Sequence, residues 1–360
     1  KIYNKFNDLA IESYQKNMSL VKVQAWFFPL MILLIGCSNL IVIYIGGNQY
    51  INNEIEIGVL AEFIIYVNML TWPVAVVGWI TSIVQQAEAS QKRINSFLKE
   101  QPEIIDGKGV DKFIKGEIEL NNVSLLYPET QIEALKGVSL KISKGSTVGI
   151  IGNIGSGKSS ILDIISRLYD PSKGSIKLDG VDMKEYTLDQ IRENIGYIPQ
   201  NAFLFSESIE DNIRFGAQKI ELKDIKEASK KAAVHRNIIS FKDSYDTLLG
   251  ERGVTLSGGQ IQRISIARAL IKNSKILLLD DCLSAVDTDT EEEILKNLKN
   301  VSTKKTTVIV SHRISSLKHA DKIIVLENGE IIQQGKHSDL IESKGYYKEL
   351  FEKQQTERVK

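Results

Sequence analysis

The chain has 360 residues, and its 45 basic and 45 acidic residues give a formal net charge of zero. A balanced charge gives no reason to expect a nucleic-acid partner, and this length allows two or three domains. The two cysteines, Cys37 and Cys282, lie in unrelated segments, which argues against a disulfide framework and favours a reducing compartment.

The sequence begins without a methionine and shows no signal peptide, so we expect a fragment or a processed product. Two long apolar stretches dominate its first hundred residues. No charged residue occurs in 23–53 or in 63–87. At a rise of about 1.5 Å per residue, such helices can cross a hydrocarbon layer of roughly 30 Å. We therefore predict an all-α transmembrane hairpin with spans at about 24–47 and 60–85. Two buried core helices of a soluble protein are the alternative.

The charges around the two spans predict an orientation for the hairpin. The connecting segment 48–62 carries glutamates but no Lys or Arg, whereas Lys and Arg gather on the outer flanks. Because positive charge accumulates on the cytoplasmic side, we expect a multi-pass protein of the plasma membrane whose helices extend into the cytoplasm. Residues 1–100 are then a transmembrane domain fragment in the lipid bilayer, and 101–115 form a linker. Two helices alone make a poor pathway, so the hairpin must pack against further membrane helices.

The remaining sequence begins with residues 116–127, which alternate between apolar and polar side chains and predict a strand. This strand ends at Tyr127, whose ring can stack on adenine through its π face. A core tyrosine at a strand end is the simpler interpretation of that residue taken alone.

The segment 152–159 fits the pattern G-x-x-x-x-G-K-[ST] at every fixed position. An apolar strand at 147–151 precedes it and a helix at 160–165 follows, which is the context that a phosphate-binding loop needs. A glycine-rich turn with a chance lysine is the alternative. Lysine reaches the β- and γ-phosphates in such loops, and the hydroxyl after it holds Mg²⁺. We expect nucleotide contacts from Gly152, Asn153, Gly155, Ser156, Gly157, Lys158, Ser159 and Ser160.

Two further polar segments follow. The strand 195–200 ends at Gln200, an amide that can bind Mg²⁺ or the attacking water, although a lone glutamine is weak support. Residues 201–265 are mainly helical and polar and predict a helical subdomain. Near its end, the string 256–260 leaves backbone N–H groups uncovered before a helix, which predicts a second phosphate-facing surface rather than a simple glycine cap. That surface consists of Ser257, Gly258, Gly259 and Gln260.

Two apolar strands then end in residues suited to phosphoryl transfer. The strand 275–280 ends at Asp280, which is placed to hold the Mg²⁺ shell, and Asp281 is placed to orient the attacking water. The strand 307–310 leads to His312, which can donate a hydrogen bond to a γ-phosphate. Taken singly, His312 is more simply interpreted as a structural histidine. With these assignments, the expected catalytic residues are Asp281, His312 and Gln200, and the expected Mg²⁺ ligands are Ser159, Gln200 and Asp280.

The order of these motifs resembles the ATP-binding-cassette (ABC) family. The segments match its A-loop, Walker A, Q-loop, signature, Walker B, D-loop and H-loop at Tyr127, 152–159, Gln200, 256–260, Asp280, 284–287 and His312. The segment 250–253 is similar to the exporter-type X-loop. The resemblance also places Asp287 of the D-loop among the nucleotide-facing residues.

The family resemblance implies an α/β P-loop NTPase domain at 116–354 with its helical subdomain at about 201–265. The hairpin resembles the last two of six membrane helices in an exporter half-transporter. The implied function is ATP-driven export of a small molecule, lipid or peptide that the sequence does not identify. In that family two cassettes dimerise head to tail, and ATP and Mg²⁺ lie between the signature of one cassette and the Walker motifs of the other.

One residue departs from the family pattern. Exporters usually carry glutamate after the Walker B aspartate, whereas this chain has Asp281. The shorter side chain sets the carboxylate back by roughly 1.5 Å, and a misplacement of that size can cost on the order of a hundredfold in rate. The resemblance then implies the slow-site half of a heterodimer, although a homodimer is possible. An ATP-gated regulatory or channel-like module with little transport of its own is the alternative function.

Overall fold

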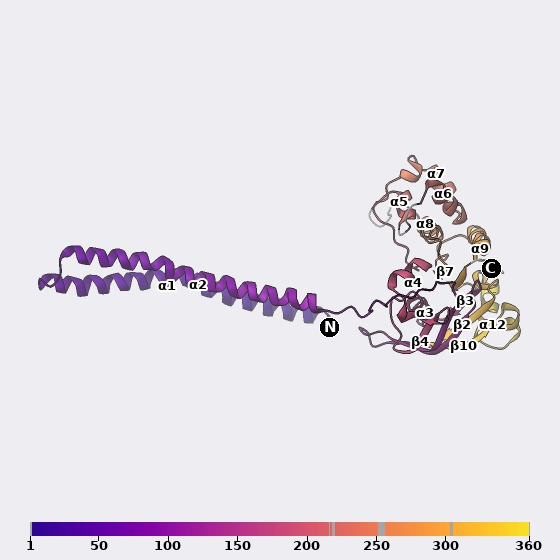
Figure 1. The fold of residues 1–360 in the computed structure, drawn as a ribbon, viewed down its shortest axis with the longest axis horizontal. Coiled ribbons are helices and arrows are strands. Elements are labelled where there is room, and N and C mark those ends of the chain that lie inside the picture. Colours follow the sequence, from indigo (N-terminus) through magenta and orange to yellow (C-terminus); the bar gives the residue numbers. More distant parts are fainter. Residues whose placement is uncertain (1, 216, 218–219, 251–255, 303–304, 360) are drawn as a thin grey trace. The chain divides into compact units, whose positions relative to one another are not determined.

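The computed structural model contains two compact units, residues 1–101 and residues 102–360 (Figure 1). The structure describes residues 2–215, 217, 220–250, 256–302 and 305–359. The first unit is helical, and the second combines two β-sheets with helices.

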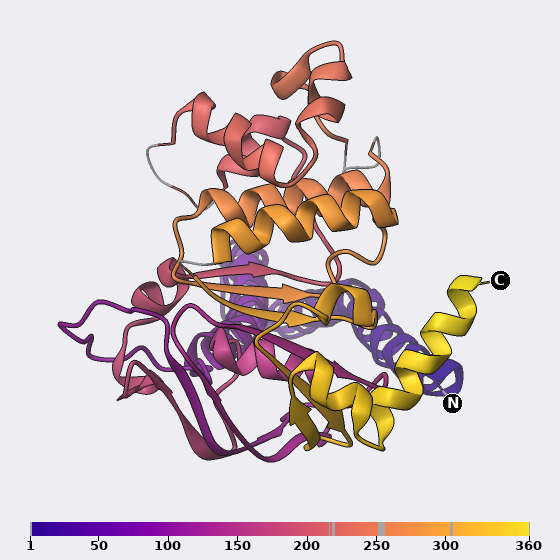
Figure 2. The ribbon, with the colours of Figure 1, turned by 90° about the vertical axis from the view of Figure 1, so that its right-hand side faces the viewer.

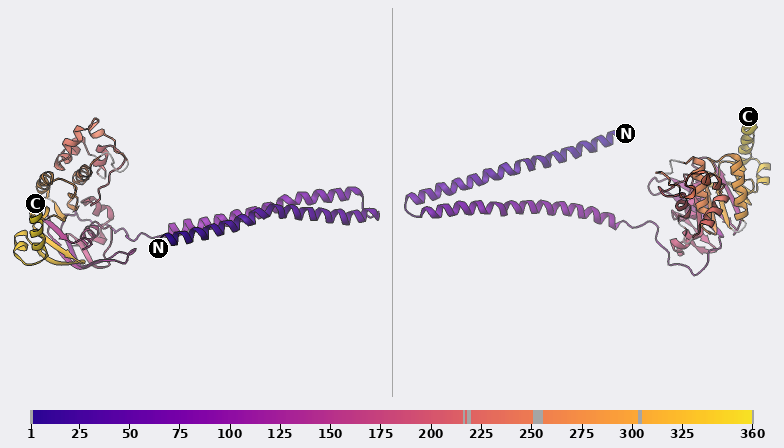
Figure 3. Two further views of the ribbon diagram at one scale, coloured as in Figure 1. Left: turned by 180° about the vertical axis from the view of Figure 1, so that it is seen from behind. Right: turned by 90° about the horizontal axis from the view of Figure 1, so that it is seen from above.

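The first unit is a helical hairpin of α1 (Ile2–Ile51) and α2 (Ile57–Lys99), joined by a short turn (Figure 3). Both helices are long and apolar enough to cross a membrane, and the predicted spans 24–47 and 60–85 lie inside them. The most apolar window of each helix has no residue buried within the chain. Such surfaces need apolar surroundings from outside the unit, which a lipid bilayer and further helices supply.

Polar side chains within the hairpin mainly form hydrogen bonds to the hairpin itself. Asn39 Nδ2 donates to Asn68 Oδ1 at 3.5 Å, and Asn68 Nδ2 donates to the carbonyl of Ile64. The Ser38 and Thr71 hydroxyls donate to carbonyls four residues earlier. The Asn39–Asn68 contact joins the two helices, whereas the other hydrogen bonds satisfy polar groups within one helix.

The second unit is built on two sheets. A four-stranded antiparallel sheet has the order β2-β1-β4-β5, and a six-stranded sheet has the order β10-β9-β3-β8-β7-β6. The strands are β1 (Ile118–Leu126), β2 (Glu133–Ile142), β3 (Thr147–Gly152), β4 (Lys173–Leu178), β5 (Val181–Asp182), β6 (Ile195–Ile198), β7 (Ile276–Asp280), β8 (Thr306–Val310), β9 (Lys322–Glu327) and β10 (Glu330–Gly335).

Strands β3, β6, β7, β8 and β9 are parallel, and β10 pairs with β9 in antiparallel fashion. The register pairs Ile150 with Val310 and Val310 with Asp280, so β3, β8 and β7 end at the same edge of the sheet. β7 is buried at every position, as expected for a central strand of a parallel sheet. The loops after these strands therefore meet at one place, where ligands bind in open α/β sheets.

The helices of the second unit cover the six-stranded sheet and extend beyond it. They are α3 (Lys158–Ile165), α4 (Leu188–Asn194), α5 (Ile209–Arg214), α6 (Leu222–Lys231), α7 (His235–Ser240), α8 (Gly258–Ile271), α9 (Thr288–Ser302), α10 (Ile314–Leu317), α11 (His337–Glu342) and α12 (Tyr346–Val359), with short 3₁₀ turns at Met183–Glu185 and Ser244–Asp246. Figure 2 shows α8 and α9 lying across one face of this sheet, beneath the small helices α5, α6 and α7.

The helix α3 lies in the core between the two sheets. Its residues Ile161, Leu162, Ile164 and Ile165 are completely buried, together with side chains of β1, β2, β3 and β8. A second apolar core lies between the other face of the six-stranded sheet and the helices α8 and α9, and it includes residues of α5, α6 and α7. The phosphate-loop helix is thus fixed by apolar packing on its sides, while its N-terminus remains at the sheet edge.

Residues 102–115, expected as a linker, lie in the second unit and contact it closely. The fully buried Arg167 donates from Nη2 to the carbonyl of Ile105 at 2.8 Å. A Cβ atom on Gly107 would lie 2.2 Å from the carbonyl oxygen of Tyr186, so this position needs glycine. The chain leading into the sheets is therefore held against the cassette rather than free.

The predicted fold class, a helical hairpin followed by an α/β P-loop NTPase domain with a helical subdomain, is confirmed. The predicted strands at 116–127, 195–200 and 307–310 are present with ends shifted by a few residues. α8 extends from Gly258 to Ile271, and its apolar positions pack in the core. The helical subdomain at about 201–265 stays a prediction.

Candidate nucleotide-binding site

The phosphate loop connects β3 to α3, as its pattern predicted. A Cβ atom on Gly157, where φ is +94°, would lie 2.4 Å from the carbonyl oxygen of Ala134. A Cβ atom on Gly152 would lie 2.1 Å from the carbonyl oxygen of Leu326. Both positions therefore require glycine, and the loop packs tightly enough to aim its N–H groups at one point.

Lys158 is the first residue of α3, and its side chain turns back over the loop. Nζ donates to the carbonyls of Gly152 at 2.9 Å and Asn153 at 2.7 Å, and the residue is only 7% exposed. Burial lowers the pKa of the Lys158 ammonium, while the nearby Asp281 and Asp280 carboxylates oppose that shift. The side chain thus places a positive charge over the loop, between its carbonyls and the two carboxylates.

The carboxylate of Asp280, at the end of β7, lies beside the start of α3. The residue is 4% exposed, and burial raises its pKa, while a hydrogen bond with the Ser159 side chain acts in the opposite direction. Carboxylate and hydroxyl oxygens are ligands that Mg²⁺ prefers. The described residues contain no cluster of three or more His, Cys, Asp or Glu that could hold a metal ion.

The loop also contains a polar atom suited to a phosphate. Ser156 Oγ is buried and has no hydrogen-bond partner among the described residues. Its amide donates to the carbonyl of Asn153 at 3.2 Å, which holds the turn closed. An unpaired buried hydroxyl costs free energy unless a ligand oxygen completes it, so this loop fits a phosphate group.

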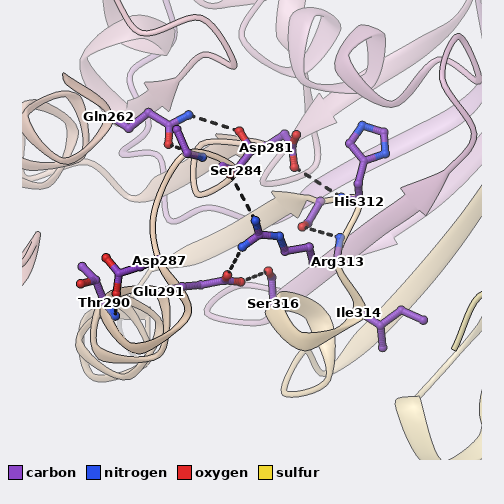
Figure 4. A network of polar contacts seen from close by, with 12 residues as sticks. Gln262, Asp281, Ser284, Asp287, Thr290, Glu291, His312, Arg313, Ile314 and Ser316 are labelled. Carbon is purple, nitrogen blue, oxygen red and sulfur yellow. Dashed lines mark hydrogen bonds and ion pairs between the residues drawn. The ribbon is translucent and has the colours of Figure 1, made fainter. Parts of the chain in front are cut away.

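Asp281 and His312 meet at the ends of β7 and β8 (Figure 4). The Asp281 amide donates to the carbonyl of Val310 at 2.9 Å, and its Oδ1 accepts from the His312 amide at 3.4 Å. The residue has a φ of +42°, which is uncommon for a side chain other than glycine. The geometry fixes the Asp281 carboxylate against the backbone of the segment that carries His312.

Tyr127 follows β1 and reaches α3 through its hydroxyl. That hydroxyl is 3.0 Å from Ser160 Oγ and donates to Asp163 Oδ2 at 3.3 Å, and the ring meets Tyr169 edge-on at 4.9 Å. Burial is the main cause that raises the pKa of the Tyr127 phenol. The structure therefore places this aromatic ring beside the phosphate-loop helix, where an adenine ring could lie against it.

The other predicted site residues lie apart from the phosphate loop. Gln200 is exposed, two residues after β6 ends, and no described contact joins it to Ser159 or Asp280. Ser257 caps α8 by accepting from the Gln260 amide at 3.3 Å, while Gln260 Oε1 accepts from the Ser257 amide. Ser257 and Gly258 are exposed, which leaves the start of this helix open to a partner.

Of the predicted D-loop and X-loop, the structure describes the D-loop residue Asp287 but only Gly250 of the X-loop. Asp287 Oδ1 accepts from the Thr290 amide at 3.0 Å and so caps the start of α9. This backbone hydrogen bond is the main cause that lowers the pKa of Asp287. The expected X-loop at 250–253 lies outside the described residues, apart from Gly250.

Two residues around the site escaped the sequence analysis. Asp163 accepts hydrogen bonds from both Tyr127 and Tyr197, and it is the lone acidic residue in an otherwise apolar turn of α3, which is a usable signal. Gln354 of α12 donates to the carbonyl of His312 at 2.7 Å and accepts from the Ile314 amide at 2.9 Å. No pattern in the sequence connects a glutamine near residue 354 to the H-loop.

One cavity of the described structure lies away from these motifs. It has a volume of about 610 Å³ and lies among α9, α10 and the strands β3 and β8. It is lined by Thr147, Glu291, Lys296, Thr307, Ser316 and His319, among others, and by none of the predicted site residues. Nucleotide binding at an exposed sheet edge needs no deep cavity.

A protein-family model described as ABC transporter matches residues 135–284, a range that includes the phosphate loop, the signature and the Walker B aspartate. The chain belongs to the ABC transporter family. It is 42% identical over 351 residues to the multidrug resistance-like ATP-binding protein MdlA of Buchnera aphidicola subsp. Schizaphis graminum, covering 97% of this chain.

A second ABC relative is the probable multidrug resistance ABC transporter ATP-binding/permease protein YheI of Bacillus subtilis, 40% identical over 98% of this chain. A structure of a bacterial Atm1-family ABC exporter with ATP bound has a TM-score of 0.81 and 32% identity, and it is matched over 96% of this chain. The ABC chain described here spans 60% of the length of each of these three proteins.

The ABC comparisons confirm the expected arrangement of the chain as a membrane protein. Its helical hairpin corresponds to membrane helices of an exporter, and its second unit is a cytoplasmic nucleotide-binding domain. The soluble alternative for the two apolar helices is therefore wrong.

Proposed function

We propose that this chain binds ATP with Mg²⁺ and forms the ATP-hydrolysing half of an ABC exporter. The observation that carries the proposal is the meeting of Lys158, Asp280, Asp281 and His312 at the ends of three parallel strands. In this assignment the loop N–H groups and Lys158 hold the phosphates, and Tyr127 lies against adenine. Residues 1–100 form the membrane part, and the nucleotide-binding domain covers 116–354.

The residues divide the chemistry among them. Ser159, Asp280 and the Gln200 amide would hold Mg²⁺, and the bound ion would supply positive charge to neutralise the charge that develops on the phosphoryl group. Asp281 is the carboxylate available to orient the attacking water, and His312 would donate a hydrogen bond toward the γ-phosphate. Preorganised groups of this kind lower the barrier because they need no rearrangement during the reaction.

The exposed start of α8 faces a second cassette in this proposal. Its phosphate-facing residues are Ser257, Gly258, Gly259 and Gln260, and Asp287 of the D-loop joins them. They would contact ATP held by the Walker motifs of a partner half-transporter. The capping box at Ser257 supports this, because it fixes the start of α8 while Ser257 and Gly258 remain exposed.

We further propose that the partner is a different half-transporter and that this chain carries the slow site. Asp281 stands where exporters usually have glutamate, so its carboxylate lies one methylene closer to the backbone, and its Oδ1 accepts from the His312 amide at 3.4 Å. A carboxylate so placed is poorly suited to reach the attacking water. The intact signature of this chain would complete a faster site on the partner.

The cargo is a small molecule, lipid or peptide, and the names of two relatives favour drugs. A slow site also suits the second candidate function, an ATP-gated regulatory or channel-like module. The two differ in energetics, because an exporter accumulates its cargo against a gradient whereas a channel only equilibrates it.

Inside-out vesicles containing the assembled transporter test the choice. We expect ATP with Mg²⁺ to drive accumulation of a fluorescent drug above its outside concentration, and vesicles carrying the Lys158→Ala variant to lose this. ATP-stimulated flux that stops at equal concentrations would overturn the exporter and favour the channel.

A further inference from the structure

The D-loop of this chain, residues 284–287, forms hydrogen bonds with two side chains that belong to none of the family motifs (Figure 4). On one side, Gln262 Nε2 donates to Ser284 Oγ at 3.3 Å, and Gln262 Oε1 accepts from the Ala285 amide at 3.1 Å. On the other side, Arg313 Nη2 donates to the carbonyl of Ser284 at 3.2 Å. These contacts fix the backbone at the start of the D-loop.

The two holding residues come from different functional segments. Gln262 lies in α8, two residues after Gln260 of the signature, and it is only 7% exposed. Arg313 directly follows His312 of the H-loop. Gln262 therefore lies next to the surface proposed to face a partner, and Arg313 lies next to this chain's own candidate ATP site.

A buried carboxylate fixes the position of Arg313. Glu291 of α9 is 2% exposed, and its Oε2 accepts from Arg313 Nη1 at 2.6 Å, while its Oε1 accepts from the Ser316 hydroxyl. The Glu291 amide also donates to the carbonyl of Asp287 at 2.8 Å. A buried carboxylate needs its cation, so the guanidinium has little freedom to leave the D-loop.

We propose that Arg313 and Gln262 are positioning residues that connect this chain's own ATP site to the signature segment it presents to the partner. The connection runs from His312 through Arg313 to Ser284 and then through Gln262 to the helix that begins after Ser257. The inference rests on the proposed function, because it needs nucleotide at both places.

The physical basis is the stiffness of this connection. Arg313 uses both arms of its planar guanidinium, one on Glu291 and one on the Ser284 carbonyl, which a lysine cannot reproduce. A shift of the H-loop on nucleotide binding is then passed to the D-loop rather than absorbed. A displacement of about 1 Å at a reacting centre can change rates by on the order of a hundredfold.

The test compares Arg313→Met, Gln262→Leu and the double variant in the assembled transporter in lipid vesicles. We expect each single variant to lower kcat for ATP by roughly tenfold or more, while KM changes by less than about twofold. The double variant should be no slower than the slower single variant, because either change already breaks one connection. Multiplying effects in the double variant, or KM effects alone, would overturn the proposal.

A matched control comes from another arginine–carboxylate pair. Arg214 contacts Glu210 within α5, and neither residue contacts the D-loop in the described structure. Arg214→Met should leave kcat within about twofold of the parent. Arg313→Lys should restore only part of the lost kcat. Full recovery with lysine would show that charge alone suffices and would overturn the role of the two-armed contact.

Amide hydrogen exchange separates this proposal from the proposed function. The Ala285 amide is bonded to Gln262, so a peptide covering 284–287 should exchange slowly in the parent and faster in Gln262→Leu and Arg313→Met, even without ATP. Unchanged exchange in both variants would overturn the connection whatever the ATPase result. A parent that hydrolyses no ATP but shows this exchange pattern would overturn only the proposed function.

Discussion

At the scale of single residues, the proposed slow site depends on Asp281. Its carboxylate contacts the His312 amide, and its backbone adopts a positive φ of +42°. A glutamate at this position would reach one methylene farther toward the γ-phosphate. In the proposed slow site, the shorter side chain of Asp281 is therefore the cause of slow hydrolysis.

We predict that Asp281→Glu raises ATP hydrolysis at this site by on the order of tenfold to a hundredfold, because the carboxylate regains its reach to the attacking water. Single-turnover hydrolysis in the assembled transporter, with the partner's site inactivated, measures this rate. Asp281→Asn is the control and should stay slow. An unchanged rate with glutamate, together with a dispensable glutamate in the partner, would refute the slow-site assignment.

At the scale of elements, α12 supports the H-loop from outside the motif set. Gln354 bridges the His312 carbonyl and the amide of the buried Ile314.

We predict that Gln354→Leu lowers ATP hydrolysis by roughly tenfold and stability by about 1–3 kcal/mol, because both backbone groups lose their partner. Steady-state hydrolysis and thermal unfolding measure the two effects. The exposed neighbour Gln355→Leu is the control, and equal losses in both variants would exclude a specific role.

The strand β8 begins beside a buried lysine, and its charge predicts a pH effect. Lys305 Nζ donates to the Lys272 carbonyl at 3.3 Å, and burial, with smaller effects of Lys231 and Lys275, lowers the pKa of Lys305 from 10.5 to about 8. The unfolded chain therefore binds more protons between pH 8 and 10.5, so this group makes the folded state more stable as pH rises through that window.

We predict that Lys305→Met removes this part of the pH dependence and stabilises the protein at pH 7 by on the order of 3 kcal/mol. Thermal unfolding of parent and variant between pH 7 and pH 10 measures the difference. The exposed Lys173→Met on β4 should leave the pH profile parallel to that of the parent. A difference between Lys305→Met and the parent that does not shrink as pH rises would contradict the prediction.

Sequence patterns predicted the strands and loops that carry the motifs. They did not predict the side chains that form hydrogen bonds to those loops. The apolar run before Lys158 and the two acids after β7 are visible because strand ends and glycine loops have characteristic residues. Gln262, Glu291 and Gln354 lie in helices, where a polar residue usually faces solvent. Only the packing of α8, α9 and α12 turns these residues inward, and no local period reports that packing.

At the scale of the whole molecule, the two units have different surfaces and different proposed roles. The apolar surface of α1 and α2 suits a lipid bilayer and further helices, and the second unit places nucleotide chemistry at a sheet edge. In the proposed function one chain is not sufficient, because the signature before α8 and the phosphate loop before α3 lie apart on the same domain. A partner would therefore have to close over this domain before ATP is hydrolysed.

The most direct test of the account is photolabelling of this chain by a radioactive azido-ATP in the presence of Mg²⁺. We expect saturable labelling of the parent and a loss of affinity on the order of tenfold or more in Lys158→Ala, because the buried ammonium faces the phosphates. The exposed Lys141→Ala should label like the parent. A parent chain that takes no label, or a Lys158→Ala chain that labels equally well, would contradict the account.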